Sequence, residues 1–327
     1  MTTTTKLGST GPAVFPIGLG CMGMSGMYGA SSDDEGVATI QEAIERGVTL
    51  IDTGDFYGMG HNEMLVGRAI RGRRDKVTLS VKFGAMRDPA GAFVGFDGRP
   101  AAVQNSLAYT LKRLGVDHVD VYRPARLDPQ VPIEDTVGAI ADLVKKGWVR
   151  HVGLSEVGVD TIRKAHAVSP VADLQIEYSI VTRGAEEKIF PVLHELGISA
   201  TLYGVLSRGL LGGKSATGKG DFRAFLPRFS EANRERNDRV VKALADFAAG
   251  RKQTAAQLCL SWVLAREPKF VPILGSRTRE QLVDLLDATK NPLSPAELRE
   301  LESLVPKDAI AGSRYQEAQM AHLDSEK

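Results

Sequence analysis

Three residues whose side chains exchange protons stand at or just after the ends of two consecutive apolar runs. Asp52 ends the run 48–52, Tyr57 follows five residues later, and Lys82 ends the run 77–82. A phenol with a reference pKa of about 10 is a poor acid at neutral pH, and a lysine ammonium held by a carboxylate makes a neighbouring phenol a better proton donor. The trio therefore predicts a site for carbonyl reduction, in which the carbonyl oxygen must receive a proton.

The elements that position these residues follow from the periodicity of the chain. Short apolar runs rich in β-branched residues alternate with segments of helical period. Strands are predicted at 17–22, 48–52, 77–82, 119–122, 149–154, 171–177, 199–203 and 270–274, and helices at 33–46, 62–70, 100–114, 133–145, 159–167, 186–196 and 278–288, with a helix-rich interval at 210–266. Strands that alternate with helices in this way predict the α/β class and a closed (β/α)8 TIM barrel, which assembles its chemistry at the C-terminal ends of its strands.

Some segments lie outside this repeat. Residues 7–15 predict a small N-terminal β-hairpin that plugs the bottom of the barrel. Extra C-terminal helices are predicted at 233–264 and 294–304, and because no linker isolates them, we expect residues 1–327 to form a single domain. The glycine-studded segment 212–238 favours a lid over a plain surface loop. Its apolar anchors are Phe222, Phe225, Leu226 and Phe229.

Composition narrows the class of protein. The chain has 327 residues, 43% hydrophobic and 25% charged, with a formal net charge of +1, which gives no electrostatic reason to expect a nucleic-acid partner. No apolar run reaches the roughly 18 residues of a membrane span, and the N-terminus lacks a signal-peptide core, so we expect a cytoplasmic protein with no membrane partner. Cys21 and Cys259 lack metal-ligand spacing, so no metal site is predicted and both are expected to be buried thiols. A GxGxxG turn typical of a Rossmann domain is also missing.

A series of longer motifs adds a family resemblance. They are GLGCMGMS (18–25), IDTGDFYGMGHNE (51–63), the strand-ending Lys82, VPIEDTVGAIADLVKKGWVRHVGLSEV (131–157), QIEYS (175–179), LYGVLSRGLLGG (202–213) and PILGSRTREQL (272–282). In this order, from about residue 6 to residue 304, the chain resembles the aldo-keto reductase superfamily, and most of all its bacterial branch that begins with GLGCMGMS. The resemblance implies an NADPH-dependent oxidoreductase that reduces small aldehydes and ketones.

The resemblance also implies roles for individual residues. Tyr57 would be the general acid, with Lys82 and Asp52 lowering the pKa of its phenol. The implied cofactor-binding positions are Ser155, Gln175, Tyr203, Gly204, Leu206, Arg208, Ser276, Arg277 and Gln281. Ser276 and Arg277 precede a helix N-terminus, where a 2′-phosphate would be held, so NADP(H) is favoured over NAD. The expected substrate-binding residues are Met22, Met24, Phe56, Phe83 and Arg123.

One departure from the family pattern bears on catalysis. Relatives usually carry a His in a run like LYYQHRVDP, and the matching run VYRPARLDP places Ala125 there. A methyl group donates no hydrogen bond, and losing one donor to the developing oxyanion costs on the order of a hundredfold in rate. Arg123, Arg126 and His61 are candidates for a replacement donor.

Two smaller departures touch the cofactor positions, and one alternative function stays open. Glu156 replaces an Asn that commonly follows Ser155, and Leu285 stands where an Asn often contacts the adenine. The alternative function is an NADPH-binding sensor or regulatory protein with weak turnover, which the missing His keeps in play. Substrate identity and oligomeric state depend on loop shapes and surfaces that spacing does not encode.

Overall fold

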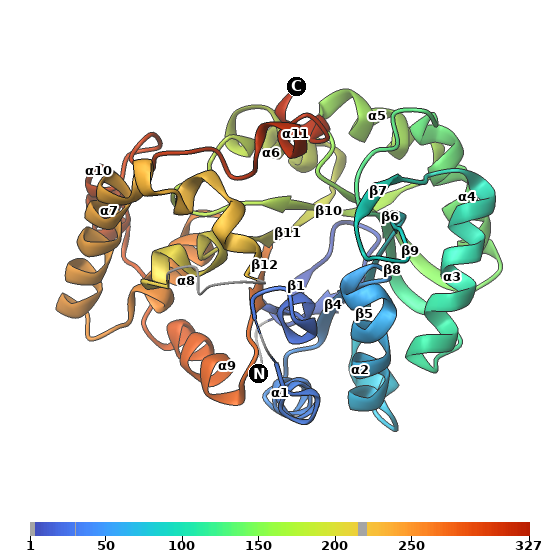
Figure 1. Cartoon of the computed structure of the whole chain (residues 1–327), viewed down its shortest axis with the longest axis horizontal. Helices are drawn as coiled ribbons and strands as arrows, with labels where there is room; N and C mark the ends of the chain where they lie inside the picture. The colour runs from blue at the N-terminus through green and yellow to red at the C-terminus, as the bar shows by residue number, and fades with distance from the viewer. Residues whose placement is uncertain (1–3, 30, 215–220) are drawn as a thin grey trace.

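The computed structural model describes residues 4–29, 31–214 and 221–327. Eight parallel strands close into a barrel (Figure 1). Around the barrel they are β3 (Gly18–Gly20), β4 (Leu50–Gly54), β5 (Thr78–Phe83), β8 (Val119–Pro124), β9 (Val149–Ser155), β10 (Val171–Glu177), β11 (Ser199–Tyr203) and β12 (Val271–Gly275). Pairing of β12 with β3, where Ile273 lies opposite Gly18, closes the circle. The predicted TIM barrel is confirmed, and every predicted strand corresponds to one of these.

Helices cover the outside of the barrel (Figure 1). They are α1 (Asp33–Glu45), α2 (His61–Ile70), α3 (Pro100–Leu114), α4 (Ile133–Lys145), α5 (Val159–Val168), α6 (Ala185–Leu196), α7 (Glu231–Gly250), α8 (Ala255–Arg266), α9 (Arg279–Leu286), α10 (Pro295–Leu304) and α11 (Glu317–Met320). Local sequence sets their ends: α3 starts on Pro100 and stops at Gly115 in the left-handed conformation, and Thr254 with Gln257 forms a capping box on α8. Among the described residues, no helix combines the length and apolar character needed to cross a membrane.

Short 3-10 helices fill the connections. They are η1 (Met22–Ser25), η2 (Tyr57–Gly60), η3 (Arg74–Lys76), η4 (Ser207–Gly212), η5 (Phe222–Phe225), η6 (Pro227–Phe229), η7 (Asp287–Lys290) and η8 (Asp324–Glu326). Three of them, η1, η2 and η4, begin within a few residues of the C-terminal end of a barrel strand. They therefore lie at the end of the barrel where the candidate chemistry is expected.

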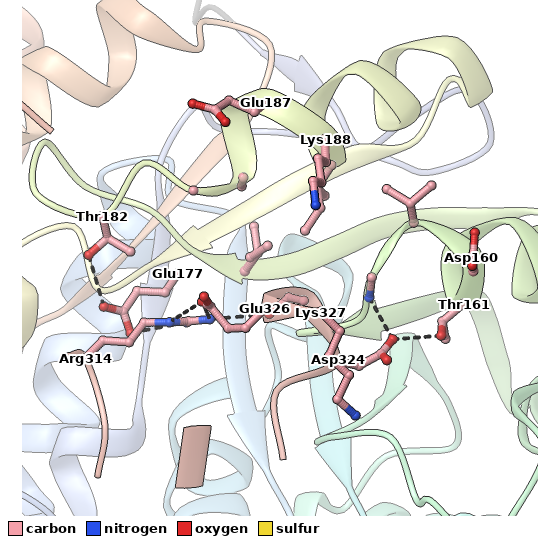
Figure 2. Close-up of a pocket in the computed structure, with 17 residues that line it drawn as sticks. Asp160, Thr161, Glu177, Thr182, Glu187, Lys188, Arg314, Asp324, Glu326 and Lys327 are labelled. Atoms are coloured by element: carbon pink, nitrogen blue, oxygen red, sulfur yellow. Dashed lines mark hydrogen bonds and ion pairs between the residues drawn. The ribbon is translucent and has the colours of Figure 1, made fainter. Parts of the chain in front are cut away.

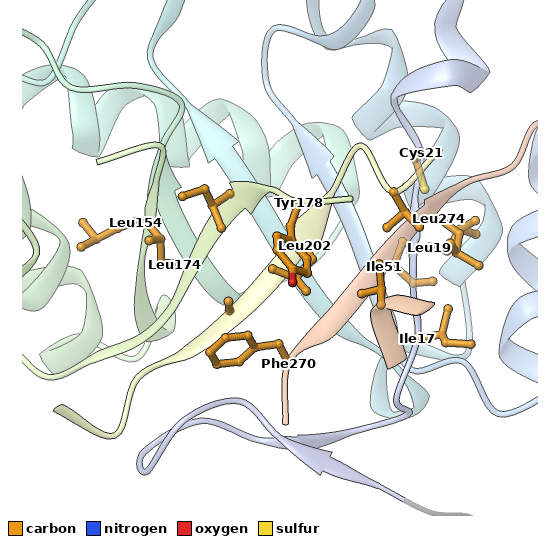
Figure 3. Packing of buried hydrophobic residues seen from close by; sticks show 14 of the residues in the cluster. Ile17, Leu19, Cys21, Ile51, Leu154, Leu174, Tyr178, Leu202, Phe270 and Leu274 are labelled. Atoms are coloured by element: carbon orange, nitrogen blue, oxygen red, sulfur yellow. The ribbon is translucent and has the colours of Figure 1, made fainter. Parts of the chain in front are cut away.

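The hydrophobic core lies between the strands and the surrounding helices. Figure 3 shows part of this packing, with Leu19, Ile51 and Leu274 beside one another. Every residue of β4, β5 and β10 is buried, as expected for parallel strands covered on both faces. Cys21 and Cys259 are buried free cysteines, which confirms that prediction.

A small hairpin closes the N-terminal end of the barrel, as predicted. Strands β1 (Thr5–Lys6) and β2 (Ala13–Val14) pair antiparallel. Leu7 and Val14 pack against the inward-facing Leu50, Val121 and Val271 in a second apolar cluster. The opposite end of the barrel is therefore the one left for substrate and cofactor.

The structure contains two elements that the periodicity did not predict, and part of the segment expected to be a lid is helical. A hairpin of β6 (Ala85–Arg87) and β7 (Phe93–Phe96) follows β5, and the segment 305–327, which includes α11, extends past the last predicted helix. Of the segment 212–238, which we expected to form a lid, the residues from 231 onward belong to α7. Residues 215–220 lie outside the described part of the chain. Leu226 is buried, whereas Phe225 is 64% exposed and anchors nothing.

Candidate active site

A buried carboxylate holds the centre of the site. Strands β4 and β5 pair with Asp52 opposite Ser80 and Gly54 opposite Lys82, so consecutive strand ends bring these side chains together. Asp52 accepts hydrogen bonds from the Lys82 ammonium, from Ser80 Oγ at 2.7 Å and from Gln175 Nε2 at 2.8 Å. Burial lowers the pKa of Lys82, and the charge of Asp52 opposes that shift. Asp52 and Lys82 therefore form a buried ion pair at the C-terminal end of the barrel.

Tyr57 lies against this ion pair. It follows β4 at the start of η2, it is 6% exposed, and Lys82 Nζ lies 5.2 Å from the centre of its ring. The next two residues, Gly58 and Met59, have φ of 56° and 53°. A left-handed Met is a strained conformation of the kind that clusters at functional sites. The structure thus brings Asp52, Tyr57 and Lys82 together, as the sequence predicted.

The electrostatics of Tyr57 differ from the expectation. Burial raises the pKa of Tyr57 above its usual range, the negative charge of Asp52 raises it further, and the charges of Arg126 and Arg123 lower it. We expected Lys82, held by Asp52, to lower this pKa, but in this structure the net shift is upward and Asp52 contributes to it. The physical reason is that a phenolate is poorly solvated here and that Lys82 is already paired with Asp52. Tyr57 consequently keeps its proton across the physiological pH range, as a proton donor must.

Arg123 lies inside the barrel, beneath this centre. It is fully buried and donates to Asp173 Oδ2 at 3.0 Å and to Ser80 Oγ at 2.8 Å. Ser80 in turn donates to Asp52, so a continuous chain of hydrogen bonds links the Arg123–Asp173 ion pair to the Asp52–Lys82 pair. The sequence led us to expect Arg123 in contact with substrate. The structure instead places it among the side chains that fill the barrel interior.

The other expected substrate-binding residues fall into two groups. Met22 and Phe56 are partly exposed, and the ring of Phe56 meets that of Tyr57 edge-on at 4.7 Å. Met24 and Phe83 have no exposed surface and belong to the hydrophobic core. The prediction that Met24 and Phe83 line the substrate space is therefore wrong. Large apolar side chains near a strand end often pack into the core against the surrounding helices.

The expected carboxamide-binding residues lie next to one another at the ends of β9 to β11. Ser155 is opposite Gln175, and Tyr203 ends the neighbouring strand. Gly204 has a φ of +72°, and a Cβ there would lie 2.8 Å from Glu177 Cγ, so this turn requires glycine. Arg208 follows Leu206 in the loop after β11 and donates to Glu177 Oε2 at 3.0 Å. These positions form one rim at the C-terminal ends of β9 to β11, which Gln175 links to the Asp52–Lys82 pair.

The residues expected to hold a phosphate follow β12, which is two strands from β4 in the barrel. Ser276 is buried, and its Oγ has no hydrogen-bond partner among the described residues. Arg277 follows it and donates from Nη1 to the Tyr28 carbonyl at 3.0 Å, while its backbone N–H donates to Gln281 Oε1 at 3.1 Å. Helix α9 begins directly afterwards with Thr278 as its N-cap. A free buried hydroxyl, a guanidinium and a helix N-terminus together suit a phosphate group.

The C-terminal segment 311–327 reaches over this rim, and sequence reasoning missed it. Arg314 donates to both carboxylate oxygens of Glu156 at 2.7 Å, and Tyr203 OH donates to the same carboxylate at 2.7 Å. Tyr315 OH lies 3.1 Å from Tyr203 OH, and the guanidinium of Arg208 lies 4.4 Å from the centre of the Tyr315 ring. Burial alone raises the pKa of Glu156, but the Arg314 guanidinium holds it below its usual range. The unusual Glu156 was the available signal, because a buried acid requires a cationic partner.

Figure 2 shows the cavity beside this segment. It measures about 430 Å³ and is lined by α5, α6 and the chain end, with Arg314 pointing toward Glu177 and Glu326, and Asp324 bonded to Thr161. Neither Tyr57 nor Lys82 lines it. Tyr57 is 6% exposed in this structure.

Comparisons with known proteins agree with this geometry. Residues 16–306 match the model of the Aldo/keto reductase family. The Probable aldo-keto reductase 1 of Glycine max is 38% identical over 315 residues, which cover 95% of this chain and 91% of that protein. The glycerol dehydrogenase of Gluconobacter oxydans superposes with a TM-score of 0.84 at 26% identity, covering 95% of this chain and 98% of the other. An aldo-keto reductase from Klebsiella pneumoniae, solved in complex with NADPH, gives 0.74 at 27% identity over 96% and 100% of the two chains.

The chain belongs to the aldo/keto reductase family. The family is one of oxidoreductases, and its barrel is the fold described above. The sequence-based recognition and fold class are thereby confirmed.

Proposed function

We propose that this protein reduces small aldehydes or ketones to alcohols with NADPH, and that Tyr57 donates the proton. The observation that carries the proposal is the cluster of Asp52, Tyr57 and Lys82 at the C-terminal ends of β4 and β5. Family membership supports carbonyl reduction with a nicotinamide cofactor, and the NADPH complex of the Klebsiella relative supports the choice of cofactor.

The residues divide the work of this reaction. The cofactor, when bound, supplies a hydride to the carbonyl carbon. As the carbonyl π electrons move to the oxygen, the Tyr57 hydroxyl donates its proton there, and solvent later returns a proton to the phenolate. Lys82 lies close enough to Tyr57 to offset the charge of that phenolate, and Asp52 holds the ammonium in place. The net change is one carbonyl, one NADPH and one proton converted to one alcohol and one NADP⁺.

The residues present also fit the cofactor. Ser155, Gln175 and Tyr203 would hold the nicotinamide end, and Arg208 the pyrophosphate. The unpartnered buried Ser276 hydroxyl beside Arg277 would receive the 2′-phosphate. An orphaned polar atom costs free energy unless a ligand satisfies it, which favours NADPH over NADH.

Replacing Arg277 should weaken NADPH binding selectively. Hydrogen bonds to charged groups contribute about 1.5–3 kcal/mol, so we expect Arg277→Met to raise the Kd of NADPH about ten- to a hundredfold and to leave that of NADH nearly unchanged. Fluorescence titration with each cofactor measures both constants. Arg279→Met is the matched control, because Arg279 lies two residues further on but is bonded to Glu35 on the surface. An equal loss for both cofactors would contradict the assigned phosphate site.

A second candidate function is an NADPH-binding sensor with weak turnover. Two observations favour it: Ala125 stands where relatives usually carry a His, and Tyr57 is almost fully buried. Fluorescence titration reports binding of NADPH, and the fall in its absorbance with a panel of aldehydes and ketones reports turnover. We expect oxidation of NADPH that depends on the carbonyl compound and saturates with it. Tight binding with no oxidation above the rate without a carbonyl compound would favour the sensor instead.

A further inference from the structure

Carbonyl reduction places negative charge on the substrate oxygen, and this site lacks the usual second donor to it. Ala125 directly follows β8, its backbone N–H donates to the Phe83 carbonyl at 2.8 Å, and its side chain offers no hydrogen bond. Removing one donor aimed at an oxyanion lowers rates by about a hundred- to a thousandfold in well-studied enzymes. Since the other residues of the site are present, we expect another side chain to donate a hydrogen bond to the substrate oxygen.

Two of the three candidates are already committed elsewhere. His61 is 2.9 Å from Ser25 Oγ and 3.1 Å from Asp33 Oδ2, which holds both ring nitrogens at the start of α2. Arg123 is fully buried and paired with Asp173. Neither side chain is free to bond a carbonyl oxygen next to Tyr57.

We propose that Arg126 takes the part of the missing donor and hydrogen-bonds the carbonyl oxygen opposite Tyr57. The inference rests on the proposed function. Arg126 directly follows Ala125, so the chain carries its guanidinium from the same loop that would have carried the His. The proton still comes from Tyr57, because a guanidinium does not deprotonate in this range of pH. Arg126 only stabilises the developing charge, and the balance of the reaction is unchanged.

The first support is the pairing of the arginines around this end of the barrel. Buried arginines here each form an ion pair with a carboxylate: Arg123 with Asp173, Arg208 with Glu177, Arg223 with Asp221, Arg228 with Glu177 and Arg314 with Glu156. Within the described part of the chain, Arg126 has no such ion pair. The charge of Glu156 acts on Arg126 without a direct ion pair, and that carboxylate is already bonded to Arg314. The Arg126 guanidinium is therefore left to stabilise a developing negative charge.

The second support is the reach and the loose attachment of Arg126. Its Nη1 lies 2.6 Å from the Ala125 carbonyl and 3.4 Å from Ser155 Oγ, and its Nη2 lies 3.4 Å from Tyr315 OH. Ser155 belongs to the rim and Tyr315 to the segment that reaches over it, and 3.4 Å is long for a hydrogen bond. Nη1 is held by a short bond to the Ala125 carbonyl, whereas the contact of Nη2 with Tyr315 is long enough to exchange for a substrate oxygen.

The electrostatic effect of Arg126 agrees with this placement. Apart from burial and Asp52, which raise the pKa of Tyr57, the charge of Arg126 is the foremost influence that lowers it, and it also lowers the pKa of Lys82. A cation felt by both groups is near enough to stabilise negative charge forming between them.

A double-mutant cycle tests the proposal. We expect Arg126→Met to lower kcat about a hundredfold at saturating NADPH and aldehyde, and Arg126→Lys to lose less because it keeps the charge. Ala125→His should change the native kcat little, but should restore most of the activity of Arg126→Met. In Arg126→Met, the limb of the pH–kcat profile that reports the ionisation of Tyr57 should also move to higher pH, because the charge of Arg126 lowers the pKa of Tyr57. Arg71→Met is the control, because Arg71 lies on the exposed surface. The Kd of NADPH and the far-ultraviolet circular dichroism spectrum show whether each variant is folded.

The outcomes separate this inference from the proposed function. The role of Arg126 is overturned if Arg126→Met keeps the native kcat. It is also overturned if adding Ala125→His to Arg126→Met restores no activity. Either result leaves the proposed carbonyl reduction unaffected. Failure of the native protein to oxidise NADPH with any carbonyl compound removes the proposed function itself.

Discussion

The Tyr57→Phe variant is expected to reduce aldehydes about 10² to 10⁴ times more slowly than the native protein, with an almost unchanged Kd for NADPH. The magnitude is that of removing a positioned general acid. Only the hydroxyl is lost, because the ring contacts with Phe56 and with the Lys82 ammonium do not require it. Steady-state kcat and a fluorescence titration of NADPH measure the two quantities. A primary isotope effect with deuterated NADPH should grow as proton and hydride transfer become rate-limiting.

Tyr109→Phe provides the matched control for this variant. Tyr109 lies on α3 and is 57% exposed, so the same chemical change occurs far from the site. Its kcat should equal that of the native protein. If Tyr57→Phe also kept the native kcat, another group would supply the proton and the proposed role of Tyr57 would be lost.

The barrel and its reacting residues could be predicted because they depend on short-range patterns. The strand expected at 77–82 is observed as β5 one residue further on, since its run of alternating apolar residues is unambiguous. Once eight such strands close in order, topology alone carries Asp52 and Lys82 to the same end of the barrel. Their contact follows from register, not from any special feature of the loops.

The parts that could not be predicted depend on residues that meet across long stretches of chain. Glu156 and Arg314 are 158 residues apart in sequence, so the unusual Glu156 indicates a cationic partner but not which residue supplies it. Met24 and Phe83 are apolar residues near strand ends, where the pattern does not distinguish core packing from a pocket wall. The raised pKa of Tyr57 likewise follows from how deeply the folded chain buries the phenol, which spacing does not encode.

The Arg123–Asp173 ion pair explains how the barrel interior can carry charge beneath the site. Both side chains have no exposed surface, and Thr201 Oγ1 donates to Asp173 Oδ2 at 2.7 Å as well. A buried pair of this kind adds little net stability compared with apolar residues, because both ions are desolvated. Its second link, through Ser80 to Asp52, ties it to the orientation of the reacting cluster.

Breaking this pair from one side should destabilise the fold more than removing it altogether. We expect Arg123→Met or Asp173→Ala to lower the free energy of unfolding by about 3–5 kcal/mol, since each leaves one charge buried without its partner. The double variant should recover most of that loss, because no unpaired charge remains. Urea denaturation followed by circular dichroism gives the three values. Single losses that simply add in the double variant would show that the two side chains act independently, against the ion pair described here.

Activity in the double variant separates the structural part of this pair from its effect on the site. With stability restored but Arg123 gone, Ser80 Oγ loses a donor and is less firmly oriented toward Asp52. We therefore expect the folded double variant to retain NADPH binding and to lose part of its kcat, since Asp52 would orient the Lys82 ammonium less rigidly beside Tyr57. Recovery of full kcat together with full stability would mean that the pair only fills the barrel, and that the Asp52–Lys82 pair holds its geometry without support from below.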